Sequence, residues 1–133
     1  MAMTSAADTR LLLTLEFPPD DITRDKARSF TQKELANGMI FPSIVLSEFL
    51  KVAGSKIGIQ GATRTINVLK ERGAKVKSVD EELALEAGRL LLKHRDVPFA
   101  DSLIAAFASS GTVDYILSDD PHFTALGIKT KWL

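Results

Sequence analysis

Four acidic residues lie in four separate segments of the chain, each where a strand or a helix is expected to begin or end, and three of the four are flanked by apolar residues. They are Asp8 in ADTRLLL, Glu48 in SIVLSEFL, Asp101 in VPFADSLIAA and Asp120 in YILSDDPHF. Carboxylates flanked by buried residues are held near the edge of a core, where desolvation and mutual repulsion are costly. A divalent cation such as Mg²⁺ or Mn²⁺ relieves this cost, because it takes oxygen ligands. The pattern therefore predicts one carboxylate cluster, assembled from distant parts of the chain.

Composition limits what kind of site the chain can build. Its 133 residues, 45% of them apolar, suit a single domain over residues 1–133 with a substantial core. The absence of cysteine excludes disulfides and thiolate metal sites, and two histidines are too few for a histidine-rich site, so any metal is expected to be held by oxygen. Seventeen basic residues balance seventeen acidic ones, so net charge neither supports nor opposes a nucleic-acid partner.

Targeting signals are not evident in the sequence. No apolar run approaches the length of a membrane span, and the N-terminal stretch MAMTSAAD lacks the basic start and long apolar segment of a secretory signal. We therefore expect a cytoplasmic protein that does not associate with membranes.

Short apolar runs alternate with longer amphipathic segments, which predicts an α/β domain with a mainly parallel sheet of four or five strands. The expected strands cover residues 7–13, 39–41, 74–79, 115–117 and 128–133. The expected helices cover residues 22–37, 43–52, 61–72, 80–94 and 98–109, and a short helical turn follows Pro121. Gly54 is expected to end the second of these helices. Because ligands bind at the carboxyl ends of the strands in such sheets, the four acids are expected there.

The same four stretches resemble the acidic motifs of PIN-domain nucleases, in the same order and at similar spacing, over essentially the whole chain. The most specific part is Pro-x-x-Asp-x-x-Ile-Ala-Ala followed by Ser-x-Asp-x-His-Phe. The small stand-alone proteins of the VapC toxin type are the most similar group. The resemblance implies a PIN-like three-layer α/β/α fold and a Mg²⁺- or Mn²⁺-dependent endoribonuclease. Its substrate would be single-stranded or structured RNA, and it would be a homodimeric toxin paired with a VapB-like antitoxin.

The resemblance also implies which residues form the site. The expected metal ligands and catalytic residues are Asp8, Glu48, Asp101 and Asp120, with Ser118 as a catalytic hydroxyl beside the last acid. Asp119 competes with Asp120 for the fourth ligand position. Alternation along a continuing strand puts Ser118 and Asp120 on one face, which favours Asp120. An Asp before Pro121 is also typical of a helix N-cap, and His122 is expected only to pack or to make a local hydrogen bond.

Arg10 departs from the family pattern, which usually has Asn or Ser after the Asp-Thr pair. A long cation at this position either pairs with an acid and disturbs the cluster, or contacts a substrate phosphate. Alternation along a strand over residues 7–13 puts Arg10 on the same side as Asp8, which favours the phosphate contact. The departure keeps an alternative function open, namely a catalytically inactive PIN-fold module that binds RNA or protein.

A phosphoacceptor receiver domain also gathers acids around Mg²⁺. That fold needs an acidic pair at the end of the first strand, an Asp after the third strand and a late Lys. Here the first strand has one acid and the pair Asp119–Asp120 comes last, so this alternative is disfavoured.

The helix expected over residues 43–52 is unusually apolar. Its apolar members are Ile44, Val45, Leu46, Phe49 and Leu50. They exceed what one helix face needs to bury in a small core, so part of this helix is expected to contact a partner.

Overall fold

The computed structural model describes residues 3–133. Residues 1 and 2, which belong to the N-terminal stretch considered above for a secretory signal, lie outside the described residues. The strands are β1 (Ser5–Ala7), β2 (Met39–Pro42), β3 (Lys75–Lys77), β4 (Tyr115–Leu117) and β5 (Thr130–Lys131). The helices are α1 (Thr9–Glu16), α2 (Asp21–Asn37), α3 (Ser43–Glu71), α4 (Glu81–Lys93), α5 (Phe99–Ser109) and α6 (Pro121–Ala125). No helix within residues 3–133 is long and apolar enough to cross a bilayer.

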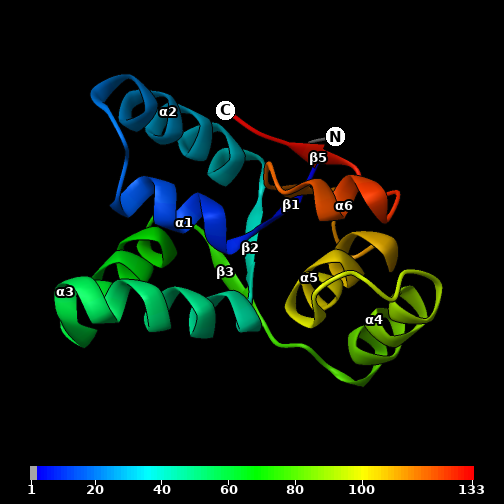
Figure 1. Ribbon diagram of the computed structural model, residues 1–133. Helices are drawn as coiled ribbons and strands as arrows, with labels where there is room; N and C mark the ends of the chain where they lie inside the picture. Colours follow the sequence, from blue (N-terminus) through cyan, green and yellow to red (C-terminus); the bar gives the residue numbers. More distant parts are fainter. Residues whose placement is uncertain (1–2) are drawn as a thin grey trace.

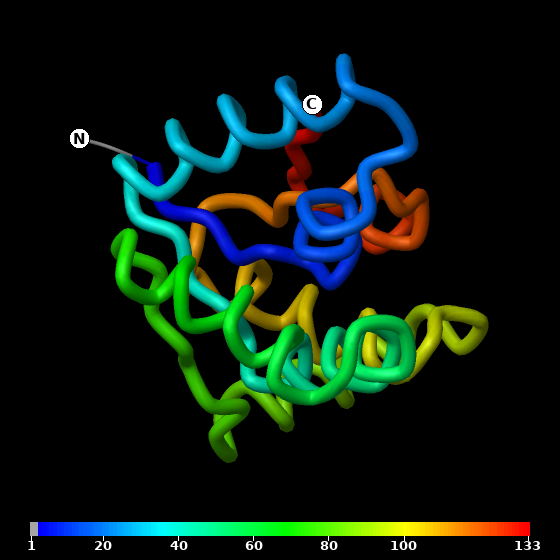
Figure 2. Tube along the Cα trace, turned by 90° about the vertical axis from the view of Figure 1, so that its left-hand side faces the viewer, coloured from blue at the N-terminus to red at the C-terminus, as the bar shows by residue number. Residues whose placement is uncertain are grey.

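The five strands form one sheet in the order β3-β2-β1-β4-β5, and every neighbouring pair is parallel. Helices α1, α2 and α3 lie on one side of the sheet, and α4, α5 and α6 lie on the other (Figure 1). In both views α1 lies between α2 and α3 (Figure 2). The predicted three-layer α/β/α fold with a parallel sheet is therefore confirmed.

The core explains why the central elements are the most apolar parts of the chain. Strand β4 is buried along its whole length, and Ile104 to Phe107 of α5 are fully buried because this helix packs against β1 and β4 on one side and α4 on the other. Helices predicted over residues 22–37, 80–94 and 98–109 agree with α2, α4 and α5 within one residue at each end. Their apolar periodicity therefore indicated a real packing face.

The strand predicted over residues 7–13 is wrong. Strand β1 ends at Ala7, and the leucines that follow belong to α1. Asp8 is the N-cap of this helix, where its side chain accepts a hydrogen bond from the Thr9 N–H at 2.8 Å. A run of three leucines has no periodicity that separates helix from strand; the capping acid and the burial of Leu11 and Leu12 decide for the helix. Asp8 thus follows the strand instead of lying within it.

The predicted break at Gly54 is also wrong. Helix α3 runs through Gly54 and kinks at Gly58, whose φ of 83° lies in the left-handed region that glycine adopts without steric cost. The two helices predicted over residues 43–52 and 61–72 are therefore the two arms of one kinked segment. Strands β3 and β5 are shorter than the predicted residues 74–79 and 128–133.

The apolar residues at the start of α3 mostly serve the protein's own core. Val45 and Phe49 are fully buried, and Ile44 and Leu46 pack against the core from its edge. Only Leu50 remains more than a third exposed. The surplus of apolar side chains predicted for this helix is therefore much smaller than the sequence indicated.

Candidate metal centre

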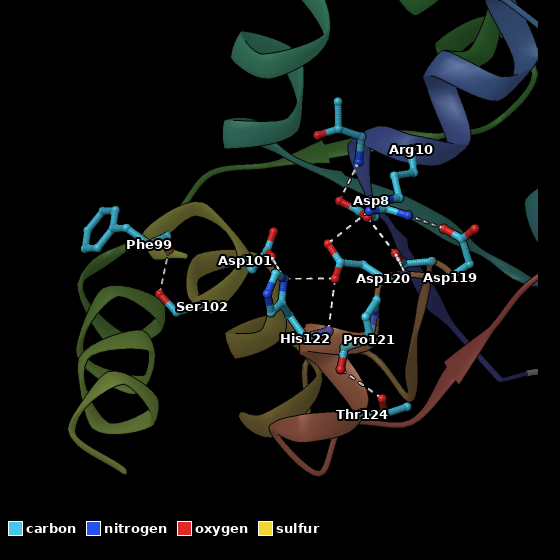
Figure 3. A network of polar contacts seen from close by, with 12 residues as sticks. Asp8, Arg10, Phe99, Asp101, Ser102, Asp119, Asp120, Pro121, His122 and Thr124 are labelled. Carbon is cyan, nitrogen blue, oxygen red and sulfur yellow. Dashed lines mark hydrogen bonds and ion pairs between the residues drawn. The ribbon is translucent and has the colours of Figure 1, made fainter. Parts of the chain in front are cut away.

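The acidic residues gather at the carboxyl ends of β1 and β4. These neighbouring strands are the point where the chain reverses its progress across the sheet, and open α/β sheets bind ligands at such a point. Asp8 directly follows β1, and Asp120 lies just beyond β4. Asp101 joins them from the first turn of α5, as Figure 3 shows.

Asp8 is the most deeply buried of the four acids, with 4% of its surface exposed. Its Oδ1 accepts a hydrogen bond from the Thr9 N–H at 2.8 Å, and its Oδ2 accepts one from the Ser118 hydroxyl at 2.6 Å. Burial raises the pKa of Asp8 to about 6, with smaller increases from the carboxylates of Asp101 and Glu48, although the two hydrogen bonds oppose the shift. The protein therefore holds this carboxylate in a fixed orientation at a cost in solvation.

Ser118 links the two loops that carry the site. Its buried hydroxyl donates to Asp8 and accepts a hydrogen bond from the Asp120 N–H at 3.0 Å. Asp120 in turn caps α6, because its Oδ1 accepts from the His122 N–H at 2.9 Å. Asp120 therefore lies in the cluster and also serves as the helix cap that the Asp-Pro sequence indicated.

His122 lies between two of the acids, a position that sequence reasoning missed. Its Nδ1 is 3.0 Å from Asp101 Oδ2 and 2.9 Å from Asp120 Oδ1 (Figure 3). Neither contact has the angles of a hydrogen bond, so within residues 3–133 this buried nitrogen has no hydrogen-bond partner. Burial raises the pKa of Asp101, and the nearby Asp120 carboxylate raises it further. The sequence signal that could have found it is the Ser-x-Asp-x-His-Phe stretch, in which His122 lies in the first turn of the helix that Asp120 caps.

Glu48 reaches the same region from the second turn of α3. Its Oε1 accepts a hydrogen bond from the Thr9 hydroxyl at 2.7 Å. Its charge is close enough to contribute to the raised pKa of both Asp8 and Asp101. The structure therefore brings all four predicted acids into one electrostatic cluster.

Asp119 points away from this cluster towards Arg10. The Arg10 guanidinium lies 2.9 Å from Asp119 Oδ1 and 3.7 Å from Asp120 Oδ2. Because Arg10 belongs to α1, the strand alternation used to orient it does not apply, yet the side chain still faces the acids (Figure 3). Both partners in the shorter pair are about half exposed, so this ion pair contributes little to stability.

We expect Arg10→Asn to tighten Mn²⁺ binding by up to about fivefold, or about 1 kcal/mol, because it removes a cation next to Asp120. Calorimetric titration checks this. If Arg10 also contacts a substrate phosphate, the same variant binds RNA more weakly and with a flatter salt dependence. Arg95→Asn, which changes an exposed arginine of the α4–α5 loop, is the matched control. No change in either affinity would show Arg10 to be a bystander.

The donor set fits a divalent cation. One ligand atom from each of Asp101, Asp120 and His122 lies within 4.8 Å of the others, so the three can converge on one ion. Of these three, His122 contributes a buried Nδ1 that has no hydrogen-bond partner among residues 3–133. Carboxylate oxygens suit Mg²⁺ and Mn²⁺, whereas an imidazole nitrogen favours a transition-metal ion over Mg²⁺.

Comparisons with known proteins agree with this fold. The profile of the PIN domain matches residues 8–129. No curated protein sequence matches the chain. The solved structures with similar folds include VapC20 of Mycobacterium tuberculosis, a sarcin-ricin loop cleaving toxin, with a TM-score of 0.69 and 20% identity over 94% of this chain and 96% of that one.

Two further structures are complexes bound to DNA. VapBC2 from Rickettsia felis has a TM-score of 0.79 and 13% identity, and the match covers 98% of both chains. VapBC from Salmonella typhimurium has a TM-score of 0.72 and 21% identity, again over 98% of both chains. At these identities the likeness shows the fold alone, whereas the profile spans nearly the whole chain and all four acids. The chain belongs to the PIN-domain family.

Proposed function

We propose that the protein is a metal-dependent endoribonuclease, the toxin of a toxin–antitoxin pair, which hydrolyses phosphodiester bonds of RNA. The observation that carries the proposal is the convergence of Asp8, Glu48, Asp101 and Asp120 at the carboxyl ends of β1 and β4, where burial raises the pKa of two of them. The similarity in fold to a toxin that cleaves the sarcin-ricin loop supports RNA as the substrate.

In this proposal Asp8, Glu48, Asp101 and Asp120 are the ligands of Mg²⁺ or Mn²⁺, and His122 lies within reach of the same ion as Asp101 and Asp120. Asp119 can replace Asp120 as the fourth metal ligand only if its ion pair with Arg10 breaks. A bound divalent ion supplies a Lewis acid and lowers the pKa of a bound water. The chain's own contribution is orientation: two hydrogen bonds fix the Asp8 carboxylate, and Ser118 fixes the loop before Asp120. The amino end of α5 places partial positive charge next to Asp101, which offsets part of the repulsion.

The test is cleavage of single-stranded RNA by purified protein. We expect cleavage with Mg²⁺ or Mn²⁺, none in excess EDTA, and recovery when the metal is restored, because the carboxylates are anionic and only a bound cation can offset the charge that builds up on the reacting phosphate. Undiminished cleavage in EDTA would overturn metal dependence. RNA binding without cleavage under every metal condition would favour the alternative, an inactive PIN-fold module that binds RNA or protein.

The antitoxin surface that we propose is a groove of about 1280 Å³ between α2 and the second arm of α3, away from the acids. Its floor is mainly apolar, and Arg28, Arg64 and Arg72 line it. An amphipathic helix with acidic flanks suits such a groove. We expect the protein to copurify with the product of an adjacent reading frame and Arg64→Glu to weaken that complex, with Arg95→Glu as the control. Equal recovery of both variants would contradict this surface.

Homodimer formation is proposed through the outer face of α4. Leu85 and Leu92, seven residues apart on one helix face, are 57% and 72% exposed, and Phe99 at the start of α5 is 68% exposed. We expect light scattering to give a dimer and Leu92→Glu to give a monomer. Ile22→Glu, at an equally exposed apolar residue of α2, is the control. A monomer at every concentration of the parent protein would exclude the dimer.

A further inference from the structure

A second, smaller surface cavity of about 340 Å³, shallow and open to solvent, borders the acid cluster. It opens between α1, the first arm of α3 and the C-terminal residues. Its polar lining includes Arg10, Lys56 and Asp119, and its aromatic lining consists of Phe17 and Trp132. None of the four acids proposed as metal ligands lines this cavity. The cavity is therefore a separate feature beside the site described above.

Arg10 and Asp119 form the wall that separates the cavity from the acids. The Arg10 guanidinium contacts Asp119 at 2.9 Å and lies 3.7 Å from Asp120, so one side chain faces both places. Asp119 and Asp120 are consecutive in the loop after β4. A nucleic-acid strand with one phosphate at the acids would therefore reach the cavity by passing over this ion pair.

The cavity combines aromatic rings with cations. Lys56 Nζ lies 5.1 Å from the centre of the Phe17 ring, and Trp132 is held by a tilted contact with Phe30 whose ring centres are 6.4 Å apart. Aromatic side chains on which bases stack, next to cations that follow the backbone, are the features by which proteins bind single-stranded nucleic acids. The lining carries two cations, Arg10 and Lys56, and one carboxylate, Asp119, which pairs with Arg10.

We propose that this cavity is a nucleotide subsite, which holds the RNA nucleotide next to the scissile phosphate. The base contacts Phe17 and Trp132, and the phosphate contacts Lys56 and Arg10. The inference rests on the proposed ribonuclease function and adds a specificity-determining site to it. A volume of about 340 Å³ lies at the lower end of ligand pockets, about 300–1000 Å³, which suits one nucleotide better than a helix of a protein partner.

The experiment uses the fact that Trp132 is the only tryptophan of the chain. In the Asp101→Asn variant, in EDTA, a short oligouridylate or oligoadenylate is expected to quench Trp132 fluorescence on binding. Trp132→Ala and Phe17→Leu should each weaken binding of the labelled oligonucleotide about tenfold, and Trp132→Phe should retain most of the affinity. Trp132→Phe also guards against loss of folding, because it keeps the aromatic contact with Phe30.

Lys56→Gln separates a phosphate contact from packing, because Lys56 is exposed. It should lower the slope of log affinity against log salt by about 0.7. In the protein with Asp101 intact and Mn²⁺ present, it should raise KM several-fold and leave kcat nearly unchanged. Lys33→Gln, at an exposed lysine of α2, should change neither quantity.

Two results overturn the inference, and they differ in what they say of the function. If the parent cleaves RNA but the Lys56, Phe17 and Trp132 variants keep its affinity, KM and salt slope, the subsite is wrong while the ribonuclease stands. If these variants lose affinity only for a copurified protein partner, the cavity binds that partner and not a nucleotide, and the ribonuclease function again stands. If RNA neither quenches Trp132 nor is cleaved by the parent, both the subsite and the proposed function are wrong.

Discussion

Asp101→Asn is expected to reduce RNA cleavage by at least about a thousandfold, equivalent to about 4 kcal/mol of transition-state stabilisation. Asp101 and Asp120 both contact His122, so the change removes one charged ligand from the group of three that can converge on an ion. The fold should survive. Burial raises the pKa of Asp101, and a neutral amide of the same shape removes that unfavourable charge.

A matched control lies five residues earlier in the chain. Asp96→Asn makes the same chemical change at an exposed carboxylate outside the cluster, and it should leave the cleavage rate within about twofold of the parent's. Cleavage rates with Mn²⁺, together with melting curves of both variants, make the comparison. Parent-like cleavage by Asp101→Asn would show that the assigned cluster is not the reaction centre.

The metal-free protein should lose stability as pH rises from about 4 to about 6. Burial raises the pKa of Asp8 from 3.8 to about 6 in the folded protein, so the folded state binds this proton more tightly than the unfolded state does. When the pKa of a carboxyl group is higher in the folded state than in the unfolded state, the free energy of unfolding falls as pH rises from the unfolded pKa to the folded pKa. Above the folded pKa the group has no further effect on stability. The expected loss is roughly 2–3 kcal/mol. Asp101, whose pKa shifts in the same direction, adds to it.

Asp8→Asn should flatten this pH dependence, because the amide carries no charge. Its free energy of unfolding at neutral pH should be at least that of the parent if the Ser118 hydroxyl keeps an acceptor. If that hydrogen bond is lost, the free energy of unfolding falls by about 1 kcal/mol from this value. Denaturant titrations at about pH 4 and pH 7 in EDTA check both statements. If the parent protein has the same free energy of unfolding at both pH values, the raised pKa of Asp8 is wrong.

Mn²⁺ should raise the melting temperature of the parent at neutral pH, since an ion that binds only the folded state stabilises it by mass action, by about 2.7 kcal/mol at a hundredfold excess over Kd. The rise should shrink in Asp8→Asn and in Asp101→Asn and persist in Asp96→Asn. Superimposable melting curves with and without Mn²⁺ in the parent would count against a shared metal site.

The sequence correctly predicted that the four acids lie close together, but it predicted some of the helices and strands that carry them wrongly. The leucines at residues 11–13 fit a strand or a helix equally well, and only the cap at Asp8 and the packing of Leu11 and Leu12 make them a helix. The kink of α3 lies at Gly58 and not at Gly54, because a glycine inside a helix costs little when its neighbours pack well, whereas a positive φ forces a break.

By itself the sequence determined the class of fold and the order of the acidic segments, whereas the place of Asp8 directly after β1 came from the structure. The first two properties follow from apolar periodicity and from the cost of burying charge, both of which are local. Only the tertiary structure decided that His122 lies between Asp101 and Asp120, that Arg10 pairs with Asp119, and that Phe17 and Trp132 line one cavity. Those contacts join residues from different elements, so their distances depend on how α1, α3 and α6 pack against the sheet, which no local pattern encodes.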